Sequence, residues 1–262
     1  MELPACTERY NGAAPVPPPR LPPRRPERTT TSSRRPQLCA PYDDDIDATL
    51  RATEKDDKER PKPDYLRSVH GDQITASARA ALYGLAAGTL HRAVSYVDRV
   101  LSLRSLPSYA DYYQLNLLGA AAVYTAAKYE EQSTPLKRMN AGAVAWYGGF
   151  ASGQEVTLME KAMVTALDYR LSGPTAETFV EHFTRYSQSE EELRVQRLAR
   201  DVADQSLMNY GCLRYLPSMV AAASIFIARC SLNRLDALVW STELQELTGY
   251  SAQDLAKCIL TM

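Results

Sequence analysis

The sequence has little of what enzyme and metal sites require. It contains three histidines and five widely spaced cysteines, with no CxxC pair and no Cys/His cluster, which argues against a structural zinc site. It also lacks the glycine-rich phosphate loops, the HExxH motif and the GxSxG motif. We therefore expect no catalytic residue, no cofactor and no bound metal.

Long apolar runs and a strong net charge are also absent. The longest apolar stretches, such as 115–127, are too short to span a bilayer, and the N-terminus lacks the apolar segment of a secretory signal. The net charge is −1, and residues 42–262 carry more acids than bases, which disfavours nucleic acid and membrane surfaces as partners. Reduced thiols are the simplest interpretation of the cysteines, so we expect a soluble protein of the nucleus, the cytoplasm or both.

Residues 1–41 form a segment of distinct composition. They hold ten of the sixteen prolines, and seven arginines against three glutamates. Such a segment has too little apolar surface to offset its ordering entropy, so it predicts a disordered tail. Arg35-Pro36-Gln37-Leu38 fits the loose Arg-x-x-Leu pattern of degradation signals, which would bring a ubiquitin ligase to the tail. An inert tail is the alternative interpretation.

Beyond residue 41 the pattern indicates an all-α fold. Three acids at 43–45 suit a helix N-terminus, and Pro61 and Pro63 end that first helix. Further along, strand alternation is absent and apolar residues recur with the period of a helix. Pro174 follows a Gly and marks a boundary between two segments.

One helix occurs twice in this sequence. Residues 120–128 read Ala-Ala-Ala-Val-Tyr-Thr-Ala-Ala-Lys, and residues 221–229 read Ala-Ala-Ala-Ser-Ile-Phe-Ile-Ala-Arg, 101 positions later. Downstream, Gly149-Phe150 is echoed by Gly249-Tyr250. Self-similarity at one long spacing predicts two copies of a structural unit, each wrapped around a central apolar helix. We expect a tail (1–41), an N-terminal helix and linker (42–65), a first domain (66–173) and a second domain (174–262) whose last helix is short or missing.

Several motifs, in order along the chain, resemble the cyclin box. They are Arg60-Pro61-Lys62-Pro63-Asp64-Tyr65, Ser95-Tyr96-Val97-Asp98-Arg99-Val100-Leu101-Ser102, Leu115-Asn116-Leu117-Leu118-Gly119, Ala126-Ala127-Lys128-Tyr129-Glu130-Glu131, Met159-Glu160 and Asp168-Tyr169-Arg170-Leu171-Ser172-Gly173-Pro174-Thr175. The residues in these motifs are similar to those of plant mitotic cyclins, and most like those of the plant F-type group. The resemblance covers residues 42–262 and implies two tandem cyclin-box domains.

The resemblance implies a regulatory subunit rather than an enzyme. Cyclins bind a cyclin-dependent protein kinase and hold its αC helix inward, so that the kinase's Lys–Glu ion pair forms. The family's kinase-contacting lysine and glutamate correspond to Lys128 and Glu160, with Tyr129 and Leu136 flanking the same surface. The alternative interpretation is that Lys128 caps its own helix and pairs with Glu160 within the fold.

Two further sets of residues follow from the resemblance. Arg79 and Asp98 correspond to a structural ion pair, and Leu82 and Asn116 to a groove that docks substrate motifs. Between Arg79 and Asp98 this chain is about ten residues shorter than the family, roughly three helical turns. A few residues are inserted around 106–113, before the central helix. We expect the groove to be impaired.

Three functions are consistent with these features. The first is regulation of a cyclin-dependent kinase in cell-cycle control. The second is a degenerate cyclin-like protein that activates nothing, because a shortened helix would uncover part of the core. The third is a transcription-factor-like binding module, which the acidic balance of residues 42–262 and the lack of a zinc ribbon disfavour.

Overall fold

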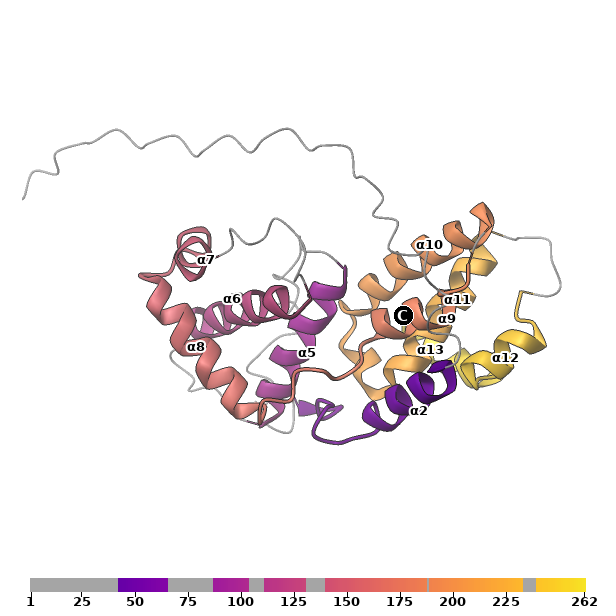
Figure 1. The fold of residues 1–262 in the computed structure, drawn as a ribbon, viewed down its shortest axis with the longest axis horizontal. Helices are drawn as coiled ribbons and strands as arrows, with labels where there is room; N and C mark the ends of the chain where they lie inside the picture. Colours follow the sequence, from indigo (N-terminus) through magenta and orange to yellow (C-terminus); the bar gives the residue numbers. More distant parts are fainter. Residues whose placement is uncertain (1–41, 66–86, 104–110, 131–139, 188, 233–238) are drawn as a thin grey trace, which may run out of the picture. The chain divides into compact units, whose positions relative to one another are not determined.

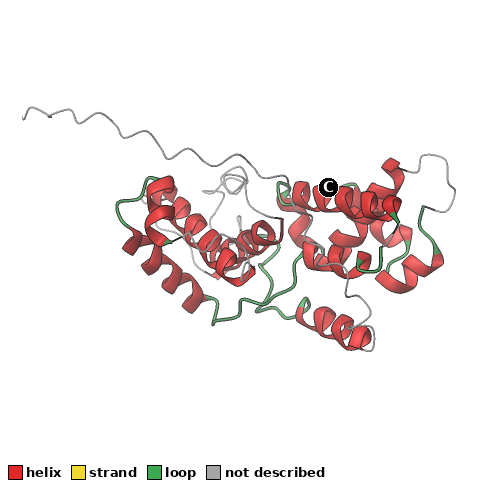
Figure 2. Cartoon of the chain, turned by 45° about the horizontal axis from the view of Figure 1, so that its top comes forward, coloured by secondary structure: helices red, strands yellow, loops and turns green. Residues whose placement is uncertain are grey.

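The computed structural model describes residues 42–65, 87–103, 111–130, 140–187, 189–232 and 239–262. Within these ranges the regular secondary structure is helical, without a strand (Figures 1 and 2). The helices are α2 (Asp43–Thr53), α5 (Ala87–Leu103), α6 (Asp111–Glu130), α7 (Ala141–Gly148), α8 (Gly153–Ala166), α9 (Ala176–Thr184), α10 (Glu190–Ser206), the 3₁₀ helix η5 (Tyr210–Arg214), α11 (Pro217–Leu232), α12 (Thr242–Thr248) and α13 (Ala252–Ile259). The all-α prediction is confirmed.

Helix α6 is the centre of the first domain. Its alanines Ala121, Ala122 and Ala126 are fully buried, and α5, α7 and α8 pack around it (Figure 1). Small side chains allow the neighbouring helices to approach closely, and α5 contributes Tyr96 and Val97 to the shared core. The prediction of a central, buried Ala-rich helix is confirmed here.

Helix α11 has the same role in the second domain. Ala221, Ala222 and Ala223 have no exposed surface, and α9, α10 and α13 surround them (Figure 1). Phe179 of α9 and Leu255 of α13 complete this core. Five consecutive residues of α11, 221–225, are buried, so this helix is enclosed on every face, whereas Val123 and Tyr124 of α6 are half-buried.

The two copies also share a chain reversal after the central helix. Gly149 directly follows α7 and Gly249 directly follows α12, as C-caps with φ values of 70° and 72°. This left-handed conformation suits glycine, which has no Cβ to collide with the backbone. The two glycines are 100 residues apart, within one residue of the 101-residue spacing of the sequence repeat.

Helix α2 lies on the second domain and is held there largely by polar contacts. None of its residues is buried. Arg51 donates to the carbonyl oxygens of Leu247 and Thr248, at 3.3 and 3.0 Å, where the C-terminus of α12 carries partial negative charge. Asp47 lies 3.0 Å from Nε2 of the buried His182, whose pKa is lowered mainly by burial. The N-terminal segment is therefore tied to the half of the chain farthest from it in sequence.

Two expected departures from the family fall partly outside the described residues. The shortened first helix, with Arg79 and Leu82, belongs to the undescribed range 66–86. Of the insertion at 106–113, residues 106–110 are also undescribed, whereas Asp111–Tyr113 form the first turn of α6. The inserted residues therefore lie partly in the central helix and not only in the connection before it.

Candidate functional site

The candidate site is built on the C-terminal part of α6 and the middle of α8. Lys128 Nζ forms an ion pair with Glu160 Oε1 and lies 4.2 Å from the centre of the Tyr124 ring. The Thr125 hydroxyl is 3.1 Å from the same carboxylate oxygen. The Lys128 side chain remains 48% exposed, against 14% for Glu160. The pair therefore lies at the surface, with the lysine half open to solvent.

This arrangement matches the alternative interpretation of Lys128 in one respect. The lysine does pair with Glu160 within the fold, as that interpretation requires. A lysine in the last turn of α6 also faces the negative end of its own helix. A surface pair of this kind leaves donors and acceptors available, because its partners are only partly enclosed. Pairing within the fold is thus compatible with a contact to another protein.

Tyr129 follows Lys128 at the end of α6 and contacts α5. Its ring is 42% exposed and lies under the Arg92 guanidinium, 4.4 Å from the ring centre. Arg92 also pairs with Glu130 and donates to the carbonyl oxygen of Leu171 at 2.8 Å. The end of α6 is therefore fixed to the segment that leads into the second domain.

Tyr169, part of the motif at 168–175, is an exposed aromatic residue that the sequence did not predict as a site residue. It lies just after α8, it is 70% exposed, and its φ of 59° is unusual for a residue other than glycine. Two residues later, the Leu171 carbonyl is held by Arg92 and by the Tyr96 hydroxyl at 2.9 Å. Burial raises the pKa of Tyr96 to about 12. No periodicity or motif in the sequence predicts the positive φ of Tyr169.

The remaining predicted positions divide between described and undescribed residues. Leu136, Arg79 and Leu82 lie outside the described residues. Asn116 is described, and its side chain is exposed on α6. The structure therefore pairs Lys128 with Glu160 and places Tyr129 next to Lys128 in the chain, against Arg92.

Asp98 lies in the core of the first domain and contacts the linker before it. The side chain is 1% exposed and accepts a hydrogen bond of 2.8 Å from the Tyr65 hydroxyl. Next to it, Arg99 pairs with Glu59 at 3.0 Å. Asp98 is thus a buried residue that links α5 to the linker before it. Its hydrogen-bond partner Tyr65, from the Arg-Pro-x-x-x-Tyr motif, was not predicted from the sequence.

In the described part of the chain, no group of three or more His, Cys, Asp or Glu side chains is arranged to hold a metal ion. None of the described helices combines the length and apolar character of a bilayer-crossing segment.

Comparison with known proteins places these observations in a family. Residues 45–172 match the model of the cyclin N-terminal domain, and residues 174–262 match that of the cyclin C-terminal domain. The rice protein cyclin-F2-2 (Oryza sativa subsp. japonica) is 62% identical over 98% of this chain and 57% of its own length. A rice cyclin of type F2-1 is 60% identical over 98% of this chain and 65% of its own length. The chain therefore spans about three-fifths of the length of these relatives.

Among solved structures, the X-ray structure of a viral cyclin from herpesvirus saimiri resembles this chain with a TM-score of 0.63. It matches 84% of this chain and 94% of the viral chain, at 15% sequence identity, and so supports the fold alone. The two family models cover nearly all of residues 45–262, and the rice relatives extend the match over almost the whole chain. The chain belongs to the cyclin family and, within it, is a plant F-type cyclin.

Proposed function

We propose that this chain binds and activates a cyclin-dependent protein kinase through Lys128, Glu160 and Tyr129, with Leu136, outside the described residues, as a further contact. Cyclins are regulatory, non-catalytic proteins, and membership of the family is consistent with such a role. The observation that carries the proposal is the Lys128–Glu160 pair, which lies at the surface of the first domain beside an exposed tyrosine.

The chemistry of the pair suits recognition of backbone groups. The lysine ammonium has three donors, and only part of it is occupied by Glu160 and the Tyr124 ring. On Glu160, the contacts among described residues converge on Oε1, so Oε2 retains its capacity to accept. One donor and one acceptor side by side can bind a carbonyl and an N–H of a kinase segment. Holding the kinase αC helix in this way favours its Lys–Glu ion pair.

Co-purification with a plant cyclin-dependent kinase tests the proposal. The wild-type chain is compared with Lys128→Ala and Glu160→Ala, and with Lys161→Ala, an exposed neighbour of Glu160 on α8, as the matched control. We expect both site variants to recover at least about tenfold less kinase, because each leaves its partner charge unpaired at the interface. Equal recovery from wild type and site variants would contradict the interface.

A phosphate-transfer assay on the same complexes separates activation from binding. Wild-type chain that raises the kinase's activity supports the full proposal. Recovery of kinase without any rise in its activity would show that the chain binds the kinase but does not activate it. That result would contradict the proposed activation and leave the proposed binding.

Three lesser expectations belong to the same proposal. The protein acts in the nucleus, the cytoplasm or both, which a fluorescent fusion would show. Arg35–Leu38, outside the described residues, recruits a ubiquitin ligase, so Arg35→Ala with Leu38→Ala would lengthen the protein's lifetime. Substrate docking through Leu82 and Asn116 is weak, and Asn116→Ala would leave substrate phosphorylation unchanged.

A further inference from the structure

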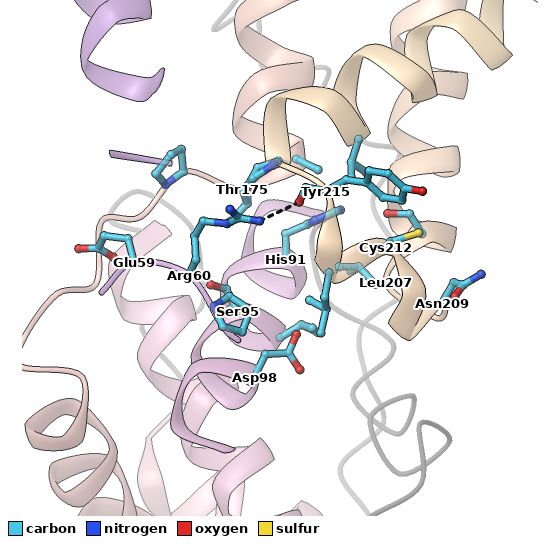
Figure 3. A pocket seen from close by; sticks show the side chains of 18 residues that line it. Glu59, Arg60, His91, Ser95, Asp98, Thr175, Leu207, Asn209, Cys212 and Tyr215 are labelled. Carbon is cyan, nitrogen blue, oxygen red and sulfur yellow. Dashed lines mark hydrogen bonds between the residues drawn. The ribbon is translucent and has the colours of Figure 1, made fainter. Parts of the chain in front are cut away.

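A cavity of about 110 Å³ lies where the two domains meet the linker that follows α2 (Figure 3). Its walls come from the linker, α5, the start of α9, the end of α10, η5 and the start of α11. A cavity of this size exceeds the space of a single water molecule, about 30 Å³ in the liquid. None of the residues of the candidate kinase-binding surface lines it.

The cavity is mainly apolar. Val94 of α5 faces it from the first domain, and Val220 of α11, Leu207 and Leu213 face it from the second. Val94 and Val220 are almost completely buried, at 4% and 6% exposure. Such walls favour a ligand with an apolar body.

Arg60 is the charged side chain that distinguishes this cavity. Its guanidinium donates one hydrogen bond, to the Tyr215 carbonyl oxygen at 3.3 Å, and has no carboxylate partner among the described residues (Figure 3). Two neighbouring titratable side chains, in contrast, have partners of opposite charge type. Glu59 pairs with Arg99 at 3.0 Å, and His91 lies 3.1 Å from Asp204. Arg60 thus keeps several donors of its planar fork unused beside an apolar cavity.

We propose that this cavity binds a small monocarboxylic acid with a short apolar body. The carboxylate would accept two hydrogen bonds from the Arg60 fork, and the hydrocarbon part would lie against Val94, Leu207 and Val220. A charge-assisted bond of this type is stronger than a neutral one, and its planar geometry selects a carboxylate over an amide.

The carboxylates around the cavity favour a ligand with one negative charge over a ligand with two. Asp98 and Glu59 both line it, and their carboxylates would repel a dianion such as phosphate more than a monoanion. Because the walls belong to both domains and to the linker, the bound acid would also hold these three parts together. Binding would therefore raise the melting temperature of the whole protein.

The experiment uses the full chain with butyrate as the probe and butyramide as its neutral counterpart of similar shape. Saturation-transfer NMR measures binding, and thermal melting measures stabilisation. We expect butyrate to bind at least about tenfold more tightly than butyramide, and Arg60→Met to remove that preference. Arg214→Met, an exposed arginine on η5 that does not line the cavity, should bind butyrate like wild type.

Two more variants keep the test decisive. Val94→Phe fills the cavity and should abolish binding of both probes, and Arg60→Lys keeps the charge but not the fork, so it should bind butyrate less tightly. If Arg60→Met does not fold, the lysine variant and Val94→Phe decide. No binding of butyrate to wild type, equal binding of the two probes, or undiminished binding to the Arg60 variants would each overturn the proposal. Lys128→Ala should bind butyrate normally, so this result is independent of kinase binding.

Discussion

The Glu54 carboxylate accepts two hydrogen bonds from Ser218, one from the backbone N–H at 3.0 Å and one from the hydroxyl at 2.8 Å. Glu54 follows α2, is 1% exposed, and lies at the N-terminus of α11, the positive end of that helix. Burial raises the pKa of Glu54, and the two bonds from Ser218 oppose that effect. One buried carboxylate thus joins the start of the described chain to the central helix of the second domain.

Replacing either member of this pair should destabilise the protein. Glu54→Ala leaves the buried N–H of Ser218 without its acceptor and leaves the Ser218 hydroxyl only the Tyr250 hydroxyl, 2.7 Å away, as a partner. We expect a loss of about 2–3 kcal/mol in the free energy of unfolding. Ser218→Ala removes the hydroxyl's bonds to Glu54 and Tyr250 but keeps the backbone N–H bond to Glu54, and we expect a loss of about 1–2 kcal/mol. Urea unfolding measures both. Glu246→Ala, an exposed residue of α12, is the control and should change stability by less than about 0.5 kcal/mol. A Glu54→Ala variant as stable as this control would show that the pair contributes nothing.

The Lys128–Glu160 pair should contribute little to stability. Half-exposed ion pairs are screened by solvent and typically contribute at most about 1 kcal/mol. We therefore expect Lys128→Met and Glu160→Gln to unfold in urea within about 1 kcal/mol of wild type. This result would show that any loss of kinase recovery comes from the interface. A loss of more than about 2 kcal/mol would instead assign the pair to the fold.

Glu177 should make stability fall as the pH rises toward neutrality. It is 7% exposed, and burial raises its pKa to about 7, although Arg200 at 2.8 Å opposes the shift. Because the folded pKa lies above the usual 4.5, the stabilisation is complete below pH 4.5 and is lost as the pH rises through about 7. The full effect is about 3 kcal/mol, from 1.4 kcal/mol per pKa unit.

Glu177→Gln should remove this dependence. The measurement is the difference in unfolding free energy between wild type and variant in urea at pH 5, 6, 7 and 8. Taking the difference cancels the effect of other groups such as His182, whose lowered pKa acts in the opposite direction below pH 6.5. A difference that does not vary with pH would show that Glu177 keeps an ordinary pKa.

The cysteines should differ sharply in reactivity. Burial raises the pKa of Cys258 to about 12, with the neighbouring Cys212 adding to the effect, whereas Cys230 is exposed. Thiolates are the reactive species, so in a Cys6→Ser, Cys39→Ser background we expect one thiol to react quickly with a disulfide reagent. The other two should react only after unfolding. Rapid reaction of three thiols in the folded protein would contradict the packing of α13 against η5.

The repeated helix shows which features of the fold could be predicted from the pattern of residues in short segments. Ala-rich segments 101 residues apart are the buried centres of two domains, as their composition requires. Gly149 and Gly249 end corresponding helices in the same left-handed conformation. These features follow from the sequence because burial of an apolar helix and the backbone freedom of glycine are properties of short segments.

The candidate site could be predicted only in part. Family resemblance pointed to Lys128 and Glu160, and the structure shows that they are close enough to pair. The motif at 168–175 includes Tyr169, but the exposure and positive φ of this residue were not predicted, because they depend on how the chain leaves α8. The role of the paired residues in kinase binding stays a prediction.

The sequence alone determined the helical class, the two similar domains and the family. Tertiary structure decided which distant residues meet. Glu54 and Ser218 are 164 positions apart, and Arg60 and Tyr215 are 155 apart. Neither pair belongs to a periodic pattern. Helix periodicity states which face of a segment is buried, but not which other segment covers it, so contacts between segments depend on the packing of the whole fold.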